Sequence, residues 1–341
     1  MKGLLLGSTA GVAGLAAWLT LGGPKLPRDI DEAIDRVSRS DLSDVVSGHT
    51  GFADSAGVRI WYEDRPAVGA ERGVVLLLTG LAGDSLFWPA SVLRALAEAG
   101  YRVVRFDARG TGESDWMEDW DRRHPYTLED MAADVVAVLD ERGVSRAHLI
   151  GLSLGGFVAQ EVAIAAPSRV VSLTLMSTSA DPTDMEVGEP RTGHFVRAGL
   201  ASLPLLRYRL LGGERNLVKE LVAKVISVNG YEDLDVEDLA RCVLYRQRFR
   251  RGLNLRAMLQ HQRAVAVTRS RYEALPSVGT PALIVHGEDD PLLPIAHAEK
   301  LARLLPHGTL LRLKGVGHVF PYPGMPDVIA TVLSHLDMNP E

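Results

Sequence analysis

Cysteine is almost absent from this chain, because Cys242 is the only one among 341 residues. A single thiol excludes an intrachain disulfide and a zinc site built from cysteines. It leaves the cellular compartment open, since many exported proteins also lack disulfides. No internal repeat is visible.

An excess of basic residues is missing as well. The 37 Lys and Arg residues are outnumbered by 43 Asp and Glu residues, and the formal net charge is −6 with histidine neutral. A protein dedicated to nucleic acids needs a strongly basic surface to replace the counterions of the phosphates. The charge balance therefore excludes that class, while 46% hydrophobic and 23% charged residues are typical of an ordinary folded protein.

Charged side chains are absent from residues 3–23. A helix of that length spans roughly 30 Å, the thickness of the hydrocarbon core of a bilayer. The pattern predicts a membrane-anchored protein with residues 1–24 as a single N-terminal hydrophobic helix. Two alternatives stay open: a signal peptide that is cleaved from an exported protein, although no clear A-x-A site follows, and an apolar helix packed on the protein itself.

Residues 25–48 are predicted to form a polar connector. Ile30, Ile34 and Val37 recur at helical spacing among charged residues, which indicates a short amphipathic helix.

From residue 49 onward, short apolar runs alternate with helical patterns. Residues 52–64 are predicted to form a hairpin that turns at Ala56-Gly57, and Thr127 with Asp130 predicts the start of a helix over 127–142. The other expected strands are 73–79, 103–107, 147–152, 170–177, 282–286 and 309–313. This alternation predicts an α/β fold with a mainly parallel, eight-stranded sheet and helices on both faces. Its core is expected at 49–180 and 277–341.

Residues 181–276 interrupt that alternation. They show several helical patterns and no strong strand, so we expect a helical cap inserted into the sheet domain. Long insertions between sheet elements commonly carry substrate selection.

The segment Gly151-Leu152-Ser153-Leu154-Gly155 matches G-x-S-x-G between an apolar strand and an apolar helix. The sharp turn of that motif exposes the serine hydroxyl, and the small residues on both sides avoid clashes with neighbouring backbone. A strand before the motif and a helix after it make the match far more specific than the motif alone. Ser153 is therefore the candidate nucleophile.

A nucleophilic serine needs a base, and the base needs a carboxylate to orient it. His318 follows the last predicted strand, whereas His286 and His148 are expected in the core and His124, His297 and His307 on the surface. Asp290 follows the preceding strand, with Asp289 beside it and Asp181, after the strand at 170–177, as further candidates for the acid. The chain order Ser153, Asp290, His318 is typical of α/β hydrolases.

The chain resembles the α/β-hydrolase superfamily over about residues 50–338, and within it the cofactor-free esterase and haloperoxidase-like branch, including the aclacinomycin methylesterases. The residues that carry the resemblance are FDARGTGES (106–114), HPY (124–126), GLSLGG (151–156), HGEDDPLLP (286–294) and GVGH (315–318).

The resemblance implies Asp290 as the acid, the backbone N–H groups of Leu81 and Leu154 as an oxyanion hole, and no metal or organic cofactor. Many members have His-Gly in the first loop, where this chain has Thr79-Gly80.

Gly80 and Trp88 are predicted to line the substrate pocket, with a core position for Trp88 as the alternative. Asp107 and Arg109 are expected to brace a loop. Residues 241–271 hold nine arginines and no acidic residue. This stretch is either a solvated helical face, partly paired with acidic residues just upstream, or a cap face for an anionic membrane or an acidic substrate.

We therefore predict a serine hydrolase that cleaves lipophilic carboxylic esters through an acyl-enzyme intermediate. Its expected partners are a small-molecule ester and, through residues 3–23, a membrane, but no nucleic acid. The alternatives are a thioesterase or lipase, which the same residues would serve, and a non-catalytic binding or scaffold protein that keeps the fold.

Overall fold

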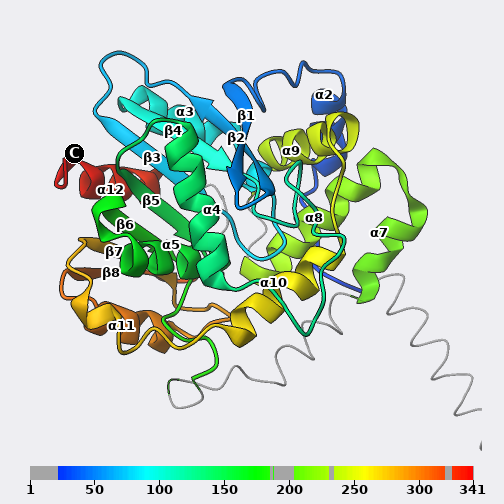
Figure 1. The fold of residues 1–341 in the computed structure, drawn as a ribbon. Helices are drawn as coiled ribbons and strands as arrows, with labels where there is room; N and C mark the ends of the chain where they lie inside the picture. The colour runs from blue at the N-terminus through cyan, green and yellow to red at the C-terminus, as the bar shows by residue number, and fades with distance from the viewer. Residues whose placement is uncertain (1–21, 185–186, 188–202, 230–233, 319–324, 341) are drawn as a thin grey trace, which may run out of the picture.

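A computed structural model describes residues 22–184, 187, 203–229, 234–318 and 325–340. Eight strands form one sheet in the order β1-β2-β4-β3-β5-β6-β7-β8 (Figure 1). The hairpin strands β1 and β2 are antiparallel, and all pairs from β4 to β8 are parallel. The prediction of an eight-stranded, mainly parallel sheet is confirmed.

The elements lie close to the predicted ranges. The strands are β1 His49–Ser55, β2 Val58–Arg65, β3 Gly73–Leu78, β4 Tyr101–Phe106, β5 Ala147–Leu152, β6 Val170–Met176, β7 Ala282–Gly287 and β8 Gly308–Leu313. The α-helices are α2 Ile30–Ser38, α3 Ala90–Glu98, α4 Leu128–Glu141, α5 Leu154–Ala165, α7 Leu206–Leu211, α8 Gly213–Asn229, α9 Val236–Phe249, α10 Arg256–Val267, α11 Ile295–Leu304 and α12 Met325–Asp337.

Local chemistry explains two of these boundaries. The β1–β2 hairpin turns at Ala56 and Gly57, both with positive φ (51° and 85°), as the tight connection requires. Helix α4 begins with a complete capping box, because Thr127 accepts from the Asp130 N–H while the Asp130 carboxylate accepts from the Thr127 N–H.

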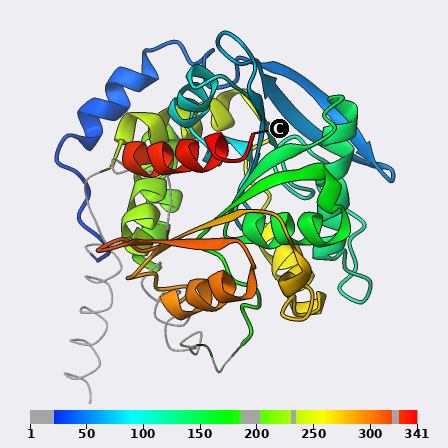
Figure 2. The ribbon, with the colours of Figure 1, turned by 90° about the vertical axis from the view of Figure 1, so that its left-hand side faces the viewer.

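Helices cover both faces of the sheet because alternate residues of a strand point to opposite sides. Leu76 and Leu78 of β3 pack in one buried cluster with α4, α5 and α11, whereas Val75 and Leu77 pack in another with α3 and α12. In Figure 2 the red helix α12 and the green helix α5 lie on opposite sides of the strands.

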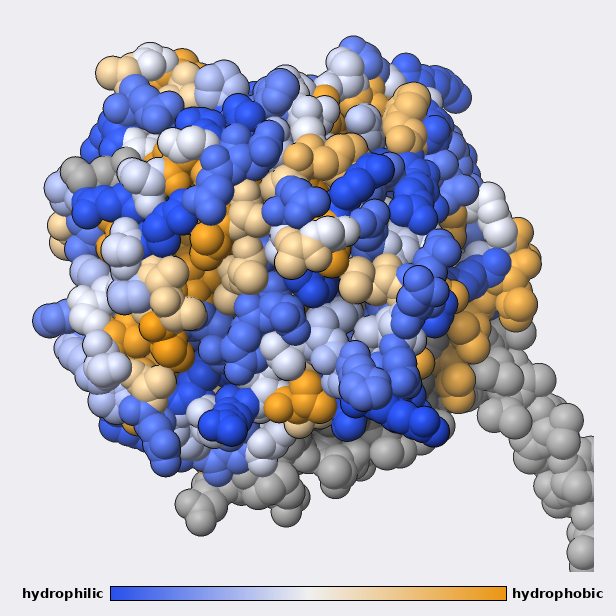
Figure 3. Space-filling model, in the orientation of Figure 1, coloured by the Kyte–Doolittle hydropathy of each residue, from blue (hydrophilic) through white to orange (hydrophobic). Residues whose placement is uncertain are grey.

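Between β6 and β7 the described chain forms helices α7 to α10, in the region that the sequence predicts as a cap. Its helices α8 and α9 pack against each other and against α2, which lies beside α9 in Figure 1. On the outer side, α7 exposes Leu206, Leu210 and Leu211, and Figure 3 shows orange side chains at the right-hand edge, where Figure 1 places this helix.

The predicted connector is more than a linker. Ile30, Ile34 and Val37 form the apolar face of an amphipathic helix, as predicted, but this face is buried in one cluster with Val222 and Leu244 of the cap. Salt bridges reinforce the contact; they join Arg36 to Glu237, Arg215 to Asp31 and Asp35, Lys219 to Asp31, and Arg241 to Asp44.

The predicted membrane-anchored localisation is wrong. None of the helices that the structure describes combines the length and the apolar character needed to cross a bilayer. The longest of them, α8, has 17 residues and carries charged side chains such as Lys219 and Glu220, whereas a span needs about 20 mostly apolar residues. The N-terminal hydrophobic helix was predicted at residues 1–24, of which 1–21 lie outside the described part of the chain.

Candidate active site

Ser153 occupies a strained turn between β5 and α5. Its φ of 52° and ψ of −112° are values that a side chain other than glycine rarely adopts. A Cβ on Gly155 would lie 2.5 Å from the carbonyl oxygen of Leu78, and one on Gly151 would overlap the backbone of Gly155. The flanking glycines are therefore required by close backbone packing, as the motif predicts.

His318 and Asp290 form a buried pair at the carboxyl edge of the same sheet. The Nδ1 atom of His318 lies 2.7 Å from Asp290 Oδ2, while Asp290 Oδ1 accepts from the N–H groups of Leu292 and Leu293 at 2.8 and 2.9 Å. Burial alone would raise the pKa of Asp290, but His318 and these hydrogen bonds outweigh burial and hold that pKa below its ordinary value.

The structure also separates Asp290 from the other candidate acids. Asp289 is exposed to solvent, and Asp181 accepts hydrogen bonds from the N–H and hydroxyl of Thr183. Because Ser153 follows β5, Asp290 follows β7 and His318 follows β8, all three lie where parallel strands end at one edge.

The loop after β3 runs beside Ser153. A Cβ on Gly80 would lie 3.6 Å from the Cβ of Ser153, so Gly80 lies directly beside the candidate nucleophile. Leu81 follows in this loop, and Leu154 is the first residue of α5. Trp88 is only 2% exposed and packs in the core cluster of α3, which corresponds to the alternative prediction for this residue.

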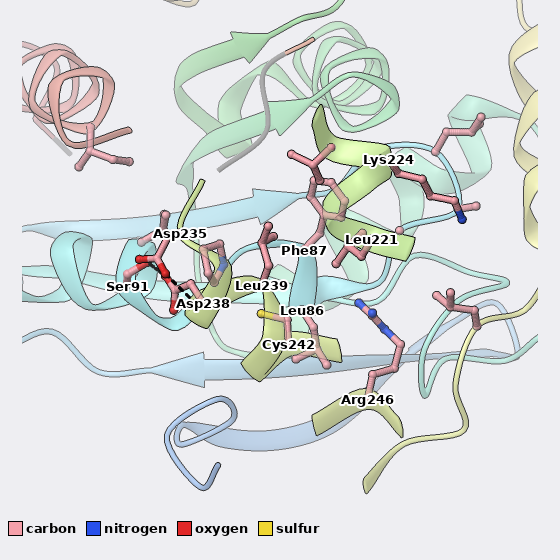
Figure 4. A pocket seen from close by; sticks show the side chains of 18 of the residues that line it. Leu86, Phe87, Ser91, Leu221, Lys224, Asp235, Asp238, Leu239, Cys242 and Arg246 are labelled. Carbon is pink, nitrogen blue, oxygen red and sulfur yellow. Dashed lines mark hydrogen bonds between the residues drawn. The ribbon is translucent and has the colours of Figure 1, made fainter. Parts of the chain in front are cut away.

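A cavity of about 680 Å³ lies between the core and the cap. Residues 81–83 and the turn at 86–87 line one part of it. Other lining residues come from α3 and α12, from the helices α7, α8 and α9, and from residues 253–258 at the start of α10. Figure 4 shows the apolar side chains of Phe87, Leu221 and Leu239 in its wall, with Arg246 and Asp238 among the charged ones. Among the described residues, neither Ser153 nor His318 lines this cavity.

The remaining histidines divide into buried and exposed ones. His286 is buried in β7, where its Nε2 lies 2.8 Å from the carbonyl oxygen of Leu293, and burial lowers its pKa. His124 and His307 are exposed, as expected. The expected surface position of His297 is wrong, because α11 turns this residue toward the core and its Nδ1 lies 2.9 Å from Ser179 Oγ.

The buried His148 in β5 makes stability depend on pH. Burial lowers its pKa from 6.5 to about 4, so between those values the unfolded chain binds a proton that the folded protein does not. We expect the free energy of unfolding to be unaffected by this group above pH 6.5 and to fall below it, by roughly 2 kcal/mol at pH 5. Urea unfolding of the parent and of His148→Gln at pH 7 and pH 5 measures the effect.

The variant should be less stable than the parent at pH 7 but lose less stability on going to pH 5. His124→Asn, at an exposed position, is the control and should keep the pH dependence of the parent. Equal pH dependence in parent and His148→Gln would contradict this prediction.

Asp107 and Arg109 brace loops, as expected. Asp107 accepts from the N–H groups of Ser85 and Glu113, both at 2.8 Å, and Arg109 forms a bidentate pair with the buried Asp134 at 2.6 and 2.7 Å.

The arginine-rich stretch at 241–271 is engaged in ion pairs in part, whereas Arg251, Arg256, Arg263 and Arg269 are exposed. Five of its nine arginines form ion pairs with carboxylates far away in the sequence, and these pairs are Arg241–Asp44, Arg246–Asp84, Arg248–Glu214, Arg250–Asp107 and Arg271–Glu161. Two of the carboxylates, Asp84 and Asp107, belong to the loops that follow β3 and β4. The stretch therefore ties the cap to the core.

The sequence patterns did not single out Asp84, which belongs to the loop beside Ser153, or His261, which contacts this loop. His261 lies on α10 between the fully buried Ala257 and Ala264. Its spacing from them places it on the buried stripe of the helix, and this signal could have identified it.

Comparisons with known proteins agree with this architecture. A family model described as alpha/beta hydrolase fold matches residues 73–324. Rhodomycin D methylesterase of Streptomyces sp. (strain C5) is 29% identical over 306 residues, which cover 82% of this chain and 95% of the relative. RutD of Variovorax paradoxus (strain S110), named as a carbamate hydrolase, is 32% identical over 260 residues, which cover 73% of this chain and 86% of the relative.

A solved structure shares the fold. The meta-cleavage product hydrolase of Pseudomonas fluorescens IP01 superimposes with a TM-score of 0.63 at 20% identity, over 84% of this chain and 97% of the other. The family match extends over most of the chain and includes the turn at Ser153, the Asp290–His318 pair and the loop beside them. This chain is thus a member of the α/β hydrolase fold family.

Proposed function

We propose that this protein is a serine hydrolase that cleaves lipophilic carboxylic esters through an acyl-enzyme intermediate on Ser153. The observation that carries the proposal is the buried hydrogen bond between His318 Nδ1 and Asp290 Oδ2, at the sheet edge where Ser153 occupies its strained turn. A histidine held in this way keeps its proton on Nδ1, which donates it to the carboxylate, so Nε2 is the basic nitrogen.

The roles follow from that tautomer. Ser153 Oγ attacks the carbonyl carbon of the ester while His318 accepts its proton. The same histidine then delivers the proton to the leaving alcohol, and the acyl group remains on Ser153 until water, deprotonated by His318, releases it as the acid. Asp290 orients the imidazole and stabilises the imidazolium that forms.

The negative charge on the carbonyl oxygen needs donors placed in advance. We assign the role of these hydrogen-bond donors to the backbone N–H groups of Leu81 and Leu154. Leu154 is the first residue of α5, where the N–H groups of a helix have no partner within the helix and the helix dipole favours negative charge. The loop that carries Leu81 lies close to Ser153 through Gly80.

The cavity beside this loop supports a lipophilic substrate. It is enclosed by the cap helices on one side and by α3 and α12 on the other, and its apolar wall would remove an acyl or alcohol group from water. We propose that residues 49–180 and 277–341 form the catalytic core, and that 181–276 form the cap that selects the substrate.

The predicted enzyme class, a carboxylic ester hydrolase, is confirmed by relatives named as esterases and hydrolases. A thioesterase or lipase would use the same residues, and a set of esters and thioesters with one common acyl group distinguishes these activities. A binding or scaffold protein that keeps the fold would leave Ser153 unreactive.

Labelling with a fluorophosphonate tests the proposal, because this probe reacts with serines that a neighbouring base has activated. We expect the parent to be labelled, and Ser153→Ala and His318→Ala to remain unlabelled while keeping the circular dichroism and melting temperature of a folded protein. Ser168→Ala, which removes an exposed serine in the turn before β6, is the control and should be labelled like the parent. A folded parent without labelling would contradict the proposed function.

A further inference from the structure

The loop after β3, which carries the candidate oxyanion donor Leu81, is held in place by contacts with other segments of the chain. It runs through Thr79-Gly80-Leu81-Ala82-Gly83. The Thr79 hydroxyl donates to the Gly83 carbonyl at 3.1 Å, and Ala82 adopts a positive φ of 56°. This backbone conformation is unfavourable for alanine, so other contacts must stabilise it.

Such a contact comes from His261 on the cap helix α10. The Ala82 N–H donates to His261 Nδ1 at 3.1 Å, and His261 Nε2 lies 2.9 Å from the carbonyl oxygen of Arg109. An N–H can only donate and a carbonyl oxygen can only accept, so both partners select one tautomer. The imidazole is neutral, with a bare Nδ1 facing Ala82 and a proton on Nε2 facing Arg109.

The surroundings of His261 preserve this state. The side chain is fully buried, its ring meets Tyr126 edge-on with centroids 6.2 Å apart, and burial lowers its pKa to about 4. The charge of the nearby Arg109 is balanced by the buried Asp134. At neutral pH, His261 therefore remains a hydrogen-bond acceptor for the loop.

A second cap residue holds the far end of the same loop. Arg246 of α9 binds both oxygens of Asp84 at 2.6 and 2.7 Å. Residues 80–84 are thus anchored twice to the cap, once through a backbone N–H and once through a carboxylate. A shift of the cap would change the loop directly beside Ser153.

We propose that His261 is a positioning residue for the oxyanion hole, supplied by the cap to a loop of the core. It acts through Ala82, whose bonded N–H fixes the peptide next to Leu81 and so the direction of the Leu81 N–H. The inference rests on the proposed function, because it assumes that the Leu81 N–H binds the oxyanion. It makes the cap a part of the catalytic geometry as well as a lid over the cavity.

Two substitutions of His261 distinguish the role of Nδ1 as a hydrogen-bond acceptor from the role of the ring in packing. Asn places an oxygen near the position of Nδ1, whereas Gln reaches the position of Nε2 and removes the acceptor near Ala82. With a chromogenic ester, we expect His261→Gln to lower kcat by about 10- to 100-fold with little change in KM, since loss of one oxyanion donor costs about 10²- to 10³-fold. His261→Asn should restore kcat to within a few fold of the parent.

Both variants lose the contact of the imidazole with Tyr126, so a merely structural role would lower the melting temperature and kcat of both alike. Equal kcat in the two variants would overturn the inference. Imidazole ¹⁵N shifts of the parent give a test that does not depend on activity or on the folding of a variant. We expect a proton on Nε2 and none on Nδ1 of His261, and the opposite tautomer would overturn the inference even in an active enzyme.

The experiments distinguish a failure of the proposed function from a failure of the inference about His261. A folded parent without fluorophosphonate labelling contradicts the role of Ser153, and with it the inference about His261. A labelled parent whose His261→Gln variant keeps the parental kcat contradicts the inference alone.

Discussion

Replacing Asp290 by Asn should lower kcat for an ester by about 10⁴-fold and leave KM within about threefold. The carboxylate accepts the Nδ1 proton of His318, and an amide at the same place can present its NH₂ group instead. The imidazole proton then moves to Nε2. This nitrogen has to be unprotonated to accept the proton of Ser153, so the histidine can no longer act as the base. The variant keeps the size of the side chain, so the loss reports the tautomer and the charge of the pair.

Asp289→Asn is a matched control one residue away. Asp289 is exposed, whereas the side chain of Asp290 is enclosed beside His318, so we expect the control to keep kcat within about twofold. Steady-state kinetics of the two variants, with melting temperatures to establish folding, decide the assignment. A large loss in Asp289→Asn with none in Asp290→Asn would assign the acid to the other residue.

Replacing Arg246 by Gln should lower the free energy of unfolding by about 3–5 kcal/mol, because it leaves the carboxylate of Asp84 buried without its partner. Burial would raise the pKa of Asp84, but Arg246 outweighs burial and keeps that pKa below its ordinary value. The exposed fractions of the two side chains are 12% and 1%, so water cannot replace the lost guanidinium.

Arg248 provides the comparison on the same helix. It also binds both oxygens of a carboxylate, that of Glu214, at 2.6 and 2.7 Å, but these side chains are 30% and 36% exposed. Arg248→Gln should therefore cost less than about 1 kcal/mol. Urea unfolding at pH 7 measures both variants, and equal losses would show that burial does not decide the strength of these pairs.

Local signals in the sequence predicted most of the sheet domain. The capping box at Thr127, the hairpin turn at Ala56-Gly57 and the apolar run of β3 each specify their structure through residues close together in the chain. The G-x-S-x-G motif likewise predicts its own turn, because Gly151 and Gly155 are required by the packing that a strand-to-helix turn produces.

Contacts between distant segments could not be predicted in this way. Nothing near Arg246 in the sequence indicates that it pairs with Asp84, 162 positions earlier, and the acidic residues just upstream of the arginine stretch were the more obvious partners. His261 was missed for the same reason, since its partners Ala82 and Arg109 become neighbours only when the cap closes on the core. The family resemblance already favoured Asp290 over Asp289, but the burial that distinguishes the two residues is created only by folding.

The packing of α2 on the cap has a consequence for synthesis on the ribosome. Arg36 and its partner Glu237 are separated by 201 positions, and the apolar face of α2 is completed by side chains of α8 and α9. At about 5–20 residues per second, α2 leaves the ribosome roughly 10–40 s before α9 is made. During that interval Ile30, Ile34 and Val37 lack the surface that finally covers them. Nascent chains at this stage therefore expose the apolar face of α2, a helix that lies outside the segment that matches the family.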